Sequence, residues 1–122
     1  MANIKTHDYG DLDVKTLTSK ELFTTTHAFT TTILEKKKIL ITMGGDHSIT
    51  PGIVTAFPKD TAVLSLDAHM DFRQRYKNDV NNHACVIRRI ADHLDIQNIA
   101  VLGIRSAEQR IPASPGKTVI FP

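Results

Sequence analysis

Two short clusters of carboxylate and imidazole side chains follow apolar runs in this sequence. Residues 44–48 read Gly-Gly-Asp-His-Ser, and residues 65–71 read Ser-Leu-Asp-Ala-His-Met-Asp. Side chains two positions apart point to the same side of an extended backbone, so Asp67, His69 and Asp71 are expected to share a face. At ~3.3 Å per residue they spread over roughly 13 Å, too far for all three to reach one ion unless the chain curls. Two neighbouring ions, roughly 3.5–4 Å apart, suit that spread better.

The donor atoms in these clusters indicate which metals they would bind. The four candidate ligands are His47, Asp67, His69 and Asp71, and all of them offer nitrogen or oxygen. Mixed sets of carboxylate and imidazole suit Mn, Fe, Ni or Zn, and a carboxylate-rich set favours Mn. Cys85 is the only cysteine, which excludes a thiolate cage for zinc and an internal disulfide. A helix cap or a solvated turn explains any single one of these residues, but two clusters that each end a buried strand favour a metal site.

Composition limits the class of protein. The chain has 122 residues, of which 41% are hydrophobic and 23% charged, as expected for one domain over residues 1–122. The net charge is +2 and the basic residues are scattered, which argues against nucleic-acid binding. Apolar runs such as residues 39–41 are far shorter than the ~18 residues of a membrane span, and the first residues start no signal-peptide pattern. We therefore expect a cytoplasmic protein with neither a membrane nor a nucleic-acid partner.

Helix signals occur before, between and after the two clusters. Residues 18–21, Thr-Ser-Lys-Glu, have the spacing of a capping box, and apolar residues continue at near-helical spacing to Leu34. We predict a helix there, although the threonines of residues 23–32 lower helix propensity. Thr50 and the proline after it indicate a short helix that Pro58 ends. Asn82 can cap a further helix that carries an apolar face as far as residue 94.

Strand signals alternate with these helices. Continuous apolar runs predict strands at residues 39–43, 62–66, 98–104 and 118–121, after an N-terminal loop over residues 1–17. This order predicts βαβ units, and hence an α/β fold with three layers, α-β-α, and a mainly parallel sheet. Ligands of open α/β sheets bind beyond the carboxyl ends of the strands, where both clusters lie.

Several motifs in succession resemble those of the ureohydrolases, the arginase and agmatinase family. They are residues 44–48, residues 67–71 (Asp-Ala-His-Met-Asp), residues 82–84 (Asn-His-Ala) followed by Arg88-Arg89, and residues 103–106 (Gly-Ile-Arg-Ser). Residues 8–11, Asp-Tyr-Gly-Asp, are similar to a segment found upstream in agmatinases. The continuation over residues 72–76 and the stretch from His83 to Arg89 resemble agmatinase more than arginase.

The resemblance implies a role for each matching residue. His47 would bind the first manganese ion, Asp67 would bridge two ions, and His69 would bind the second. Asp71 would bind the first ion and hold the hydroxide that attacks the guanidinium carbon of agmatine, which gives urea and putrescine. His83 resembles the histidine that carries protons to the leaving group. Its surroundings depart from the family, because Asn81-Asn82 stands where relatives more often have a Tyr-Ser-like pair.

The resemblance covers only the central segment of a ureohydrolase, so the fold would be truncated. The later motif Ser-x-Asp-x-Asp-x-x-Asp-Pro, which supplies further bridging and terminal carboxylates, is absent from these 122 residues. The first ion keeps His47, Asp67 and Asp71, while the second keeps only Asp67 and His69. Two divalent ions carry +4 against −2 from the carboxylates, so one weakly bound Mn²⁺ is expected.

Three functional hypotheses remain open for such a segment. The chain is an agmatinase-like hydrolase segment, or one of arginase or another guanidino-hydrolase, that acts with a partner chain or within a longer protein. Alternatively, it is a truncated, catalytically inactive ureohydrolase fragment, or an α/β interaction module that has lost the chemistry. A truncated sheet would expose strand edges, which favours association with a complementary chain or as a homo-oligomer.

Overall fold

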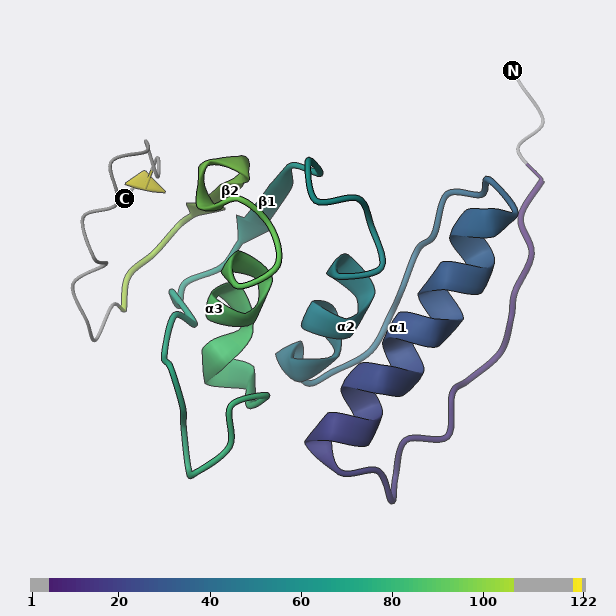
Figure 1. Ribbon diagram of the computed structural model, residues 1–122, viewed down its shortest axis with the longest axis horizontal. Coiled ribbons are helices and arrows are strands. Elements are labelled where there is room, and N and C mark those ends of the chain that lie inside the picture. Colours follow the sequence, from purple (N-terminus) through teal and green to yellow (C-terminus); the bar gives the residue numbers. More distant parts are fainter. Residues whose placement is uncertain (1–4, 107–119, 122) are drawn as a thin grey trace.

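The computed structural model describes residues 5–106, 120 and 121 (Figure 1). Its elements in chain order are helix α1 (Ser19–Glu35), the 3-10 turn η1 (His47–Ile49), helix α2 (Thr50–Val54), strand β1 (Val63–Leu66), the 3-10 turn η2 (His83–Cys85), helix α3 (Val86–Ala91), the 3-10 turn η3 (Ile96–Asn98), strand β2 (Ile99–Leu102) and strand β3 (Ile120–Phe121). Helix α3 lies between the parallel strands β1 and β2, and together the helices and strands confirm the α/β class.

The strands form a parallel sheet in the order β1-β2-β3. Val63 pairs with Ile99 and Leu66 with Leu102, so β1 and β2 end at the same edge. This register confirms the parallel sheet predicted from residues 62–66 and 98–104. The strand predicted at residues 118–121 is described only at residues 120 and 121, and the other two positions lie outside the described residues.

One face of the sheet carries the core. The buried cluster joins α3 and the residue Leu94 to β2, and comprises Val86, Ile87, Ile90, Leu94, Ile99 and Val101. On the opposite face of β1, Leu64 is 63% exposed and Leu66 is 77% exposed. The third layer predicted from the sequence is therefore not formed by the described residues, because no described helix covers that face of β1.

The strand predicted at residues 39–43 is also not formed. These residues carry no ladder, and Ile39, Ile41 and Met43 are the most exposed of the large hydrophobic side chains in the described chain. An apolar run becomes a strand only where a neighbour accepts its backbone hydrogen bonds, and the described residues offer none beside it. The strand predicted at residues 39–43 is therefore wrong for the described chain, because the apolar segment has no partner strand there.

Helix α1 begins as the sequence predicts. Glu21 Oε2 accepts a hydrogen bond from the Thr18 backbone N–H at 2.8 Å, and Thr18 Oγ1 accepts one from the Glu21 N–H at 3.3 Å, which completes the capping box. The threonine-rich interior is compatible with a helix because buried hydroxyls bond to the preceding turn. Thr26 Oγ1 donates to the Leu22 carbonyl at 2.8 Å, which satisfies its polar atom inside the protein.

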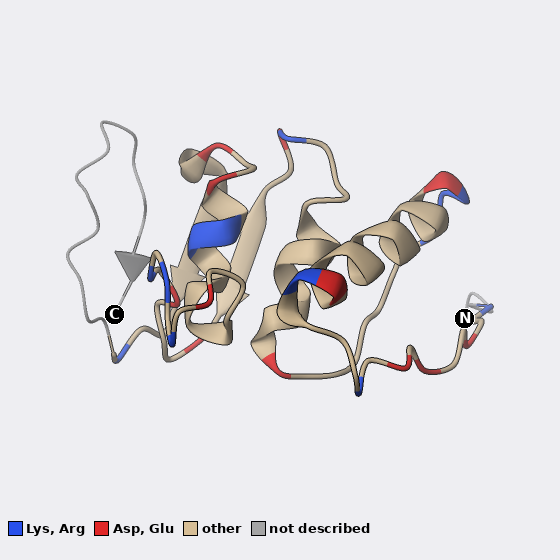
Figure 2. Ribbon diagram, turned by 60° about the horizontal axis from the view of Figure 1, so that its bottom comes forward, with Lys and Arg blue, Asp and Glu red and all other residues tan. Residues whose placement is uncertain are grey.

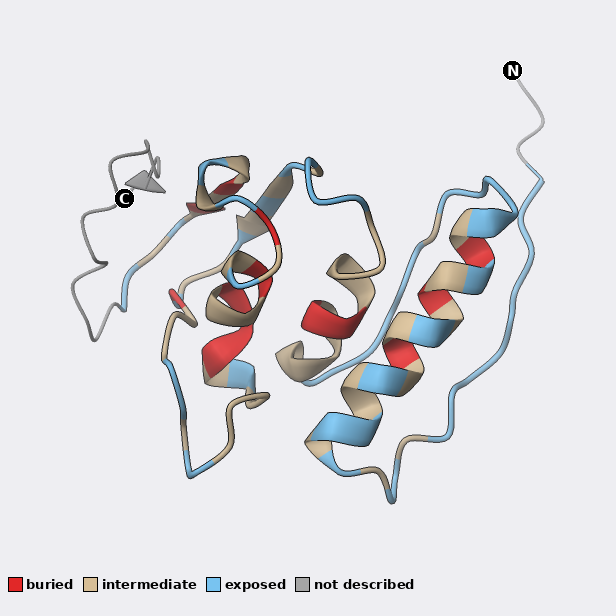
Figure 3. Cartoon of the chain, in the orientation of Figure 1, coloured by how far each residue is buried: buried red, intermediate tan, exposed pale blue. Residues whose placement is uncertain are grey.

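Close packing of α1 against α2 requires a glycine. A Cβ on Gly52 would lie 2.1 Å from Thr26 Oγ1 and 2.5 Å from the carbonyl oxygen of Phe23, so no side chain fits there. His27 Nδ1 lies 3.1 Å from Thr55 Oγ1 and ties the same two helices together. Figure 3 shows the buried residues of α1 and α2. Because α2 follows η1 directly, this packing fixes the position of the first cluster.

Helix α3 has the predicted cap but a different start and end. Asn82 Oδ1 accepts a hydrogen bond from the Ala84 N–H at 3.2 Å, and the first turn after it is 3-10 rather than α. The α-helical part ends at Ala91, and Leu94 is buried beyond that end. Charged residues of both signs are spread along the described chain (Figure 2). None of the helices in the described part is long and apolar enough to cross a membrane.

Candidate metal centre

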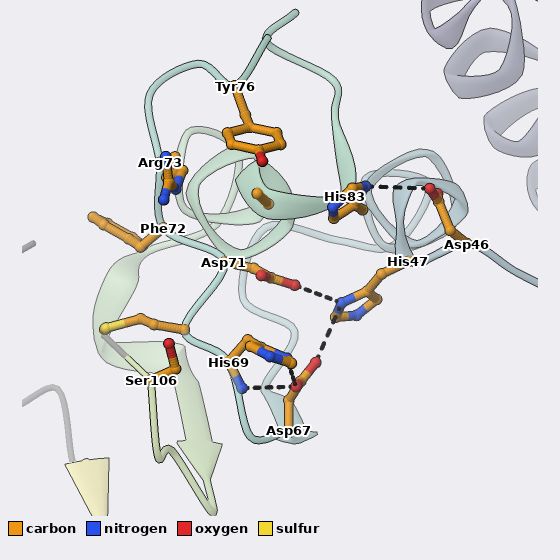
Figure 4. Close-up of a pocket in the computed structure, with 12 residues that line it drawn as sticks. Asp46, His47, Asp67, His69, Asp71, Phe72, Arg73, Tyr76, His83 and Ser106 are labelled. Carbon is orange, nitrogen blue, oxygen red and sulfur yellow. Dashed lines mark hydrogen bonds and ion pairs between the residues drawn. The ribbon is translucent and has the colours of Figure 1, made fainter. Parts of the chain in front are cut away.

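The two clusters meet at the carboxyl end of β1 (Figure 4). His47 begins η1, and Asp67 directly follows β1. His47 Nδ1 lies 2.9 Å from Asp71 Oδ2 and 3.4 Å from Asp67 Oδ2. Residues from separate loops, 20 and more positions apart in the chain, therefore converge on one imidazole nitrogen, where the strand edge predicted them.

Backbone hydrogen bonds hold the second cluster in place. The Asp67 N–H donates to the Leu102 carbonyl at 3.0 Å, which extends the pairing of β1 with β2. The Ala68 carbonyl then accepts hydrogen bonds from the N–H groups of Arg105 at 2.8 Å and Ser106 at 3.1 Å. These bonds anchor the loop to the segment after β2 and hold Asp67 at the end of β1.

A left-handed residue turns the loop at its far end. Asp71 has φ +45°, a conformation that Asp tolerates better than most residues. In this conformation its carbonyl accepts hydrogen bonds from the N–H groups of Ile87 at 3.0 Å and Arg88 at 3.4 Å, two amides at the start of α3 that lack helical partners. The backbone over residues 67–71 is therefore not extended, which is the condition for its carboxylates to reach one ion. The loop curls instead and brings two carboxylates to one imidazole.

The three converging side chains fit one cation. One ligand atom each from His47, Asp67 and Asp71 lie within 4.8 Å of one another. An ion at roughly 2.0–2.6 Å from each ligand keeps any two of them within about 5 Å, so the group meets this condition. Two carboxylates and one imidazole form a mixed donor set of the kind that suits Mn, Fe, Ni or Zn.

His69 lies outside that group of three but beside it. Its Nδ1 is 3.3 Å from Asp67 Oδ1, and its backbone N–H donates to the same oxygen at 2.8 Å. Asp67 thus presents one oxygen to His47 and the other to His69, as a bridging carboxylate would. The His69 side chain is 68% exposed, and the described residues provide it with one carboxylate neighbour, that of Asp67.

The imidazole of His83 lies across the cleft from these ligands. Its Nδ1 is 3.3 Å from Asp46 Oδ2, and its ring meets that of Tyr76 edge to face at 5.9 Å. The Arg73 guanidinium lies 4.7 Å from the centre of the same Tyr76 ring. The cleft has a volume of about 480 Å³, and all four of these residues line it together with the candidate ligands. The candidate ligands and His83 therefore open onto the same cleft.

Asp46 was given no role from the sequence. Its Oδ1 accepts hydrogen bonds from the Ser48 N–H at 3.0 Å and from the Ser48 hydroxyl. The Ser48 hydroxyl is the main reason why the pKa of Asp46 falls below its ordinary value, and His83 adds to the effect against partial burial. Its place next to His47 in the first cluster is the only sequence signal for it. The pairing with His83 joins loops that are 37 positions apart.

Cys85 follows the expectation of a small buried hydrophobe. It is fully buried at the start of α3, and burial raises the pKa of its thiol. Its Sγ lies 3.8 Å from the Asp79 carbonyl oxygen, to which it can donate weakly. A raised thiol pKa opposes a role as a nucleophile, because only the thiolate is reactive.

Comparison with known proteins agrees with the motifs and the geometry. The sequence model of the arginase family matches residues 1–118, and the chain belongs to this family. Its relatives include an N(1)-aminopropylagmatine ureohydrolase of Thermococcus kodakarensis, 46% identical over 70 residues that make up 57% of this chain and 23% of that protein. An agmatinase of Bacillus subtilis is 29% identical over 109 residues, 87% of this chain and 38% of that protein.

Solved structures show the same relationship. The agmatine ureohydrolase of Thermoplasma volcanium superposes with a TM-score of 0.71 at 42% identity, over 73% of this chain and 30% of that one. The arginase of Bacillus subtilis superposes with a TM-score of 0.61 at 18% identity, over 82% of this chain and 43% of that one, which shows a shared fold. The chain spans less than two-fifths of the length of the curated relatives named here.

Proposed function

We propose that this chain is the central part of an agmatinase-like binuclear manganese hydrolase, which converts agmatine and water to putrescine and urea. The observation that carries the proposal is the convergence of His47, Asp67 and Asp71 within 4.8 Å at the carboxyl end of β1. Family membership supports the reaction class, since the arginase family uses Mn²⁺ and its members here are ureohydrolases of guanidino compounds. In full-length relatives, the third layer and the remaining strands of the arginase-like fold would come from the parts that this chain does not match.

Residues of this chain would take separate roles in metal binding and proton transfer. His47, Asp67 and Asp71 would hold the first ion, and Asp67 with His69 would hold the second. A pair of divalent cations supplies a hydroxide at neutral pH, because it lowers the pKa of water from ~15.7 towards ~7. Asp71 would orient that nucleophile toward the guanidinium carbon, and His83 would carry a proton to the departing amine.

The described ligands are too few for two ions. Asp67 and His69 give the second ion two ligands, and Asp67 and Asp71 return −2 against the +4 of two divalent ions. We therefore propose one weakly bound Mn²⁺ and no independent turnover. The missing carboxylates would come from a complementary chain or from the rest of a longer protein. Exposed apolar side chains on the unpaired segment of residues 39–43 and on β1, such as Ile41 and Leu66, support such a partner, since they leave surface for it to cover.

An alternative is a catalytically inactive fragment, or a segment of an arginase or another guanidino-hydrolase. Urea release from agmatine and from arginine with added Mn²⁺ separates these possibilities. The measurement uses the 122-residue chain alone and mixed with the C-terminal part of Bacillus subtilis agmatinase. We expect urea release from agmatine in the mixture but not from the chain alone. The His83→Asn variant is expected to abolish this release. The His93→Asn variant is the control, because His93 does not line the cleft.

Each other result of this assay contradicts part of the proposal. Release by the chain alone would show that its metal site is complete, against the ligand count. Faster release from arginine would assign the segment to arginase. No release in either preparation would favour the inactive fragment.

A further inference from the structure

Asp46 and His83 form a pair that the ligand set does not use. Asp46 precedes η1, and His83 is the first residue of η2. Asp46 Oδ2 lies 3.3 Å from His83 Nδ1. Both side chains line the cleft, and the contact is one of the places where the two loops meet (Figure 4).

The carboxylate is held so that one oxygen remains for the imidazole. Asp46 caps η1, and its Oδ1 accepts hydrogen bonds from the Ser48 N–H and the Ser48 hydroxyl. These bonds fix the plane of the carboxylate, and Oδ2 then points at His83. An oxygen of a carboxylate can only accept a hydrogen bond, so a hydrogen bond across this 3.3 Å contact requires the proton to be on Nδ1 of His83.

The imidazole is held from two further sides. Its backbone follows the Asn82 cap, with the Cys85 N–H bonded to the Asn82 carbonyl at 2.8 Å. The ring of Tyr76 lies 5.9 Å from the His83 ring, and Tyr76 is itself fixed by paired backbone hydrogen bonds with Asp79 at 2.9 Å. With Nδ1 turned to Asp46, the opposite edge of the His83 ring faces the cleft (Figure 4).

We propose that Asp46 is a positioning residue, whose Oδ2 accepts the hydrogen bond of the His83 Nδ1–H and thereby leaves Nε2 of His83 unprotonated toward the cleft. A hydrogen bond at one ring nitrogen decides which nitrogen carries the proton, so the carboxylate selects the tautomer. In that tautomer, Nε2 can take up a proton and pass it on. The use of Nε2 in catalysis rests on the proposed function, but the tautomer itself does not.

The Asp46→Asn variant tests this pair with little change in shape. Asn is as good a helix cap as Asp, and its amide oxygen can still accept the Ser48 N–H. The amide nitrogen then stands where Oδ2 was, and it donates instead of accepting. It can pair only with an unprotonated Nδ1, so the variant is expected to move the His83 proton to Nε2.

The measurement is long-range ¹H–¹⁵N correlation of the histidine rings in the metal-free 122-residue chain. The spectra are recorded at about pH 9, and the protonated and unprotonated nitrogens of a neutral imidazole have well-separated ¹⁵N shifts. The His83→Asn variant assigns the signal. Asp95→Asn is the matched control, because Asp95 caps η3 and accepts the Gln97 N–H at 3.2 Å in the same way.

The expected result is an Nδ1–H tautomer for His83 in the native chain and in Asp95→Asn, and an Nε2–H tautomer in Asp46→Asn. An Nε2–H tautomer in the native chain would overturn the inference whether or not the variant folds. An unchanged Nδ1–H tautomer in folded Asp46→Asn would overturn it as well. Urea release is measured separately, so failure of the proposed hydrolase activity leaves this test intact.

Discussion

The sharpest prediction concerns the carboxylate at the centre of the candidate metal site. Asp67 Oδ1 accepts the His69 N–H at 2.8 Å, while Oδ2 lies 3.4 Å from His47 Nδ1. In Asp67→Asn the amide oxygen can keep the loop hydrogen bond, and the amide nitrogen replaces the ligand oxygen. The substitution therefore removes one of three ligand atoms and one of two negative charges, with little change in shape.

The expected loss of affinity follows from the place of each residue in the site. Removal of a group that only supports a metal ligand costs 10–100-fold in metal affinity, so loss of a direct ligand is expected to cost about 100-fold or more, about 2.8 kcal/mol. His69→Ala is expected to cost less, about 10-fold, because His69 lies outside the group that fits one ion and supports the ligand Asp67 at 3.3 Å. The two variants thus separate a first site with three ligands from a second site with two.

Isothermal titration of the chain with Mn²⁺ measures both the affinity and the number of ions bound. We expect about one ion per chain, in accordance with the ligand count. Asp8→Asn is the matched control, since Asp8 Oδ1 accepts the Gly10 N–H at 2.8 Å in a similar turn away from the site. An Asp67→Asn affinity within about threefold of the native chain, against the cost cited above, would refute the assignment. So would a loss in His69→Ala as large as that in Asp67→Asn, or two tightly bound ions.

Other predictions concern the scaffold. Gly52→Ala is expected to lower the free energy of unfolding by about 1–3 kcal/mol in urea denaturation, because its Cβ would overlap Thr26 Oγ1 and a backbone carbonyl. Glu21 has a lowered pKa because it accepts hydrogen bonds from the Thr18 hydroxyl and backbone. Its contribution to stability is therefore present above its unfolded pKa and lost as pH falls through the lower folded value, and Thr18→Ala should flatten the acid limb of a stability–pH curve. Cys85 is buried with a raised thiol pKa, so iodoacetamide should modify it at neutral pH only after denaturant unfolds the chain, as read by mass spectrometry.

Sequence patterns predicted helices and strands correctly where the residues that cap or pair with them also belong to the described chain. The capping box at Thr18, the Asn82 cap and the two paired strands all depend on neighbours within the described residues. The apolar run at residues 39–43 has the same pattern as β1 but forms no ladder. An apolar run indicates that a segment is suited to burial, but it does not indicate whether a neighbouring strand is present to pair with it.

The candidate site was predictable by residue type and only partly by geometry. The motifs identified His47, Asp67 and Asp71, and the strand edge placed them together. The curl between the two aspartates was not predictable, because it depends on a left-handed Asp71 whose carbonyl meets the first amides of α3. The contact of Asp46 with His83 was missed for the same reason, since it arises only when two loops approach each other.

The described residues hold the proposed first ion site in place, although they offer too few ligands for the two ions proposed above. Backbone hydrogen bonds from the segment after β2 and from the start of α3 hold both ends of the loop that carries Asp67 and Asp71. The packing of α2 on α1 through Gly52 fixes the start of η1, where His47 lies. None of these contacts involves the missing carboxylates. The first site should therefore be formed before any partner binds, and a complementary segment would add ligands for the second ion to a half that is already in place.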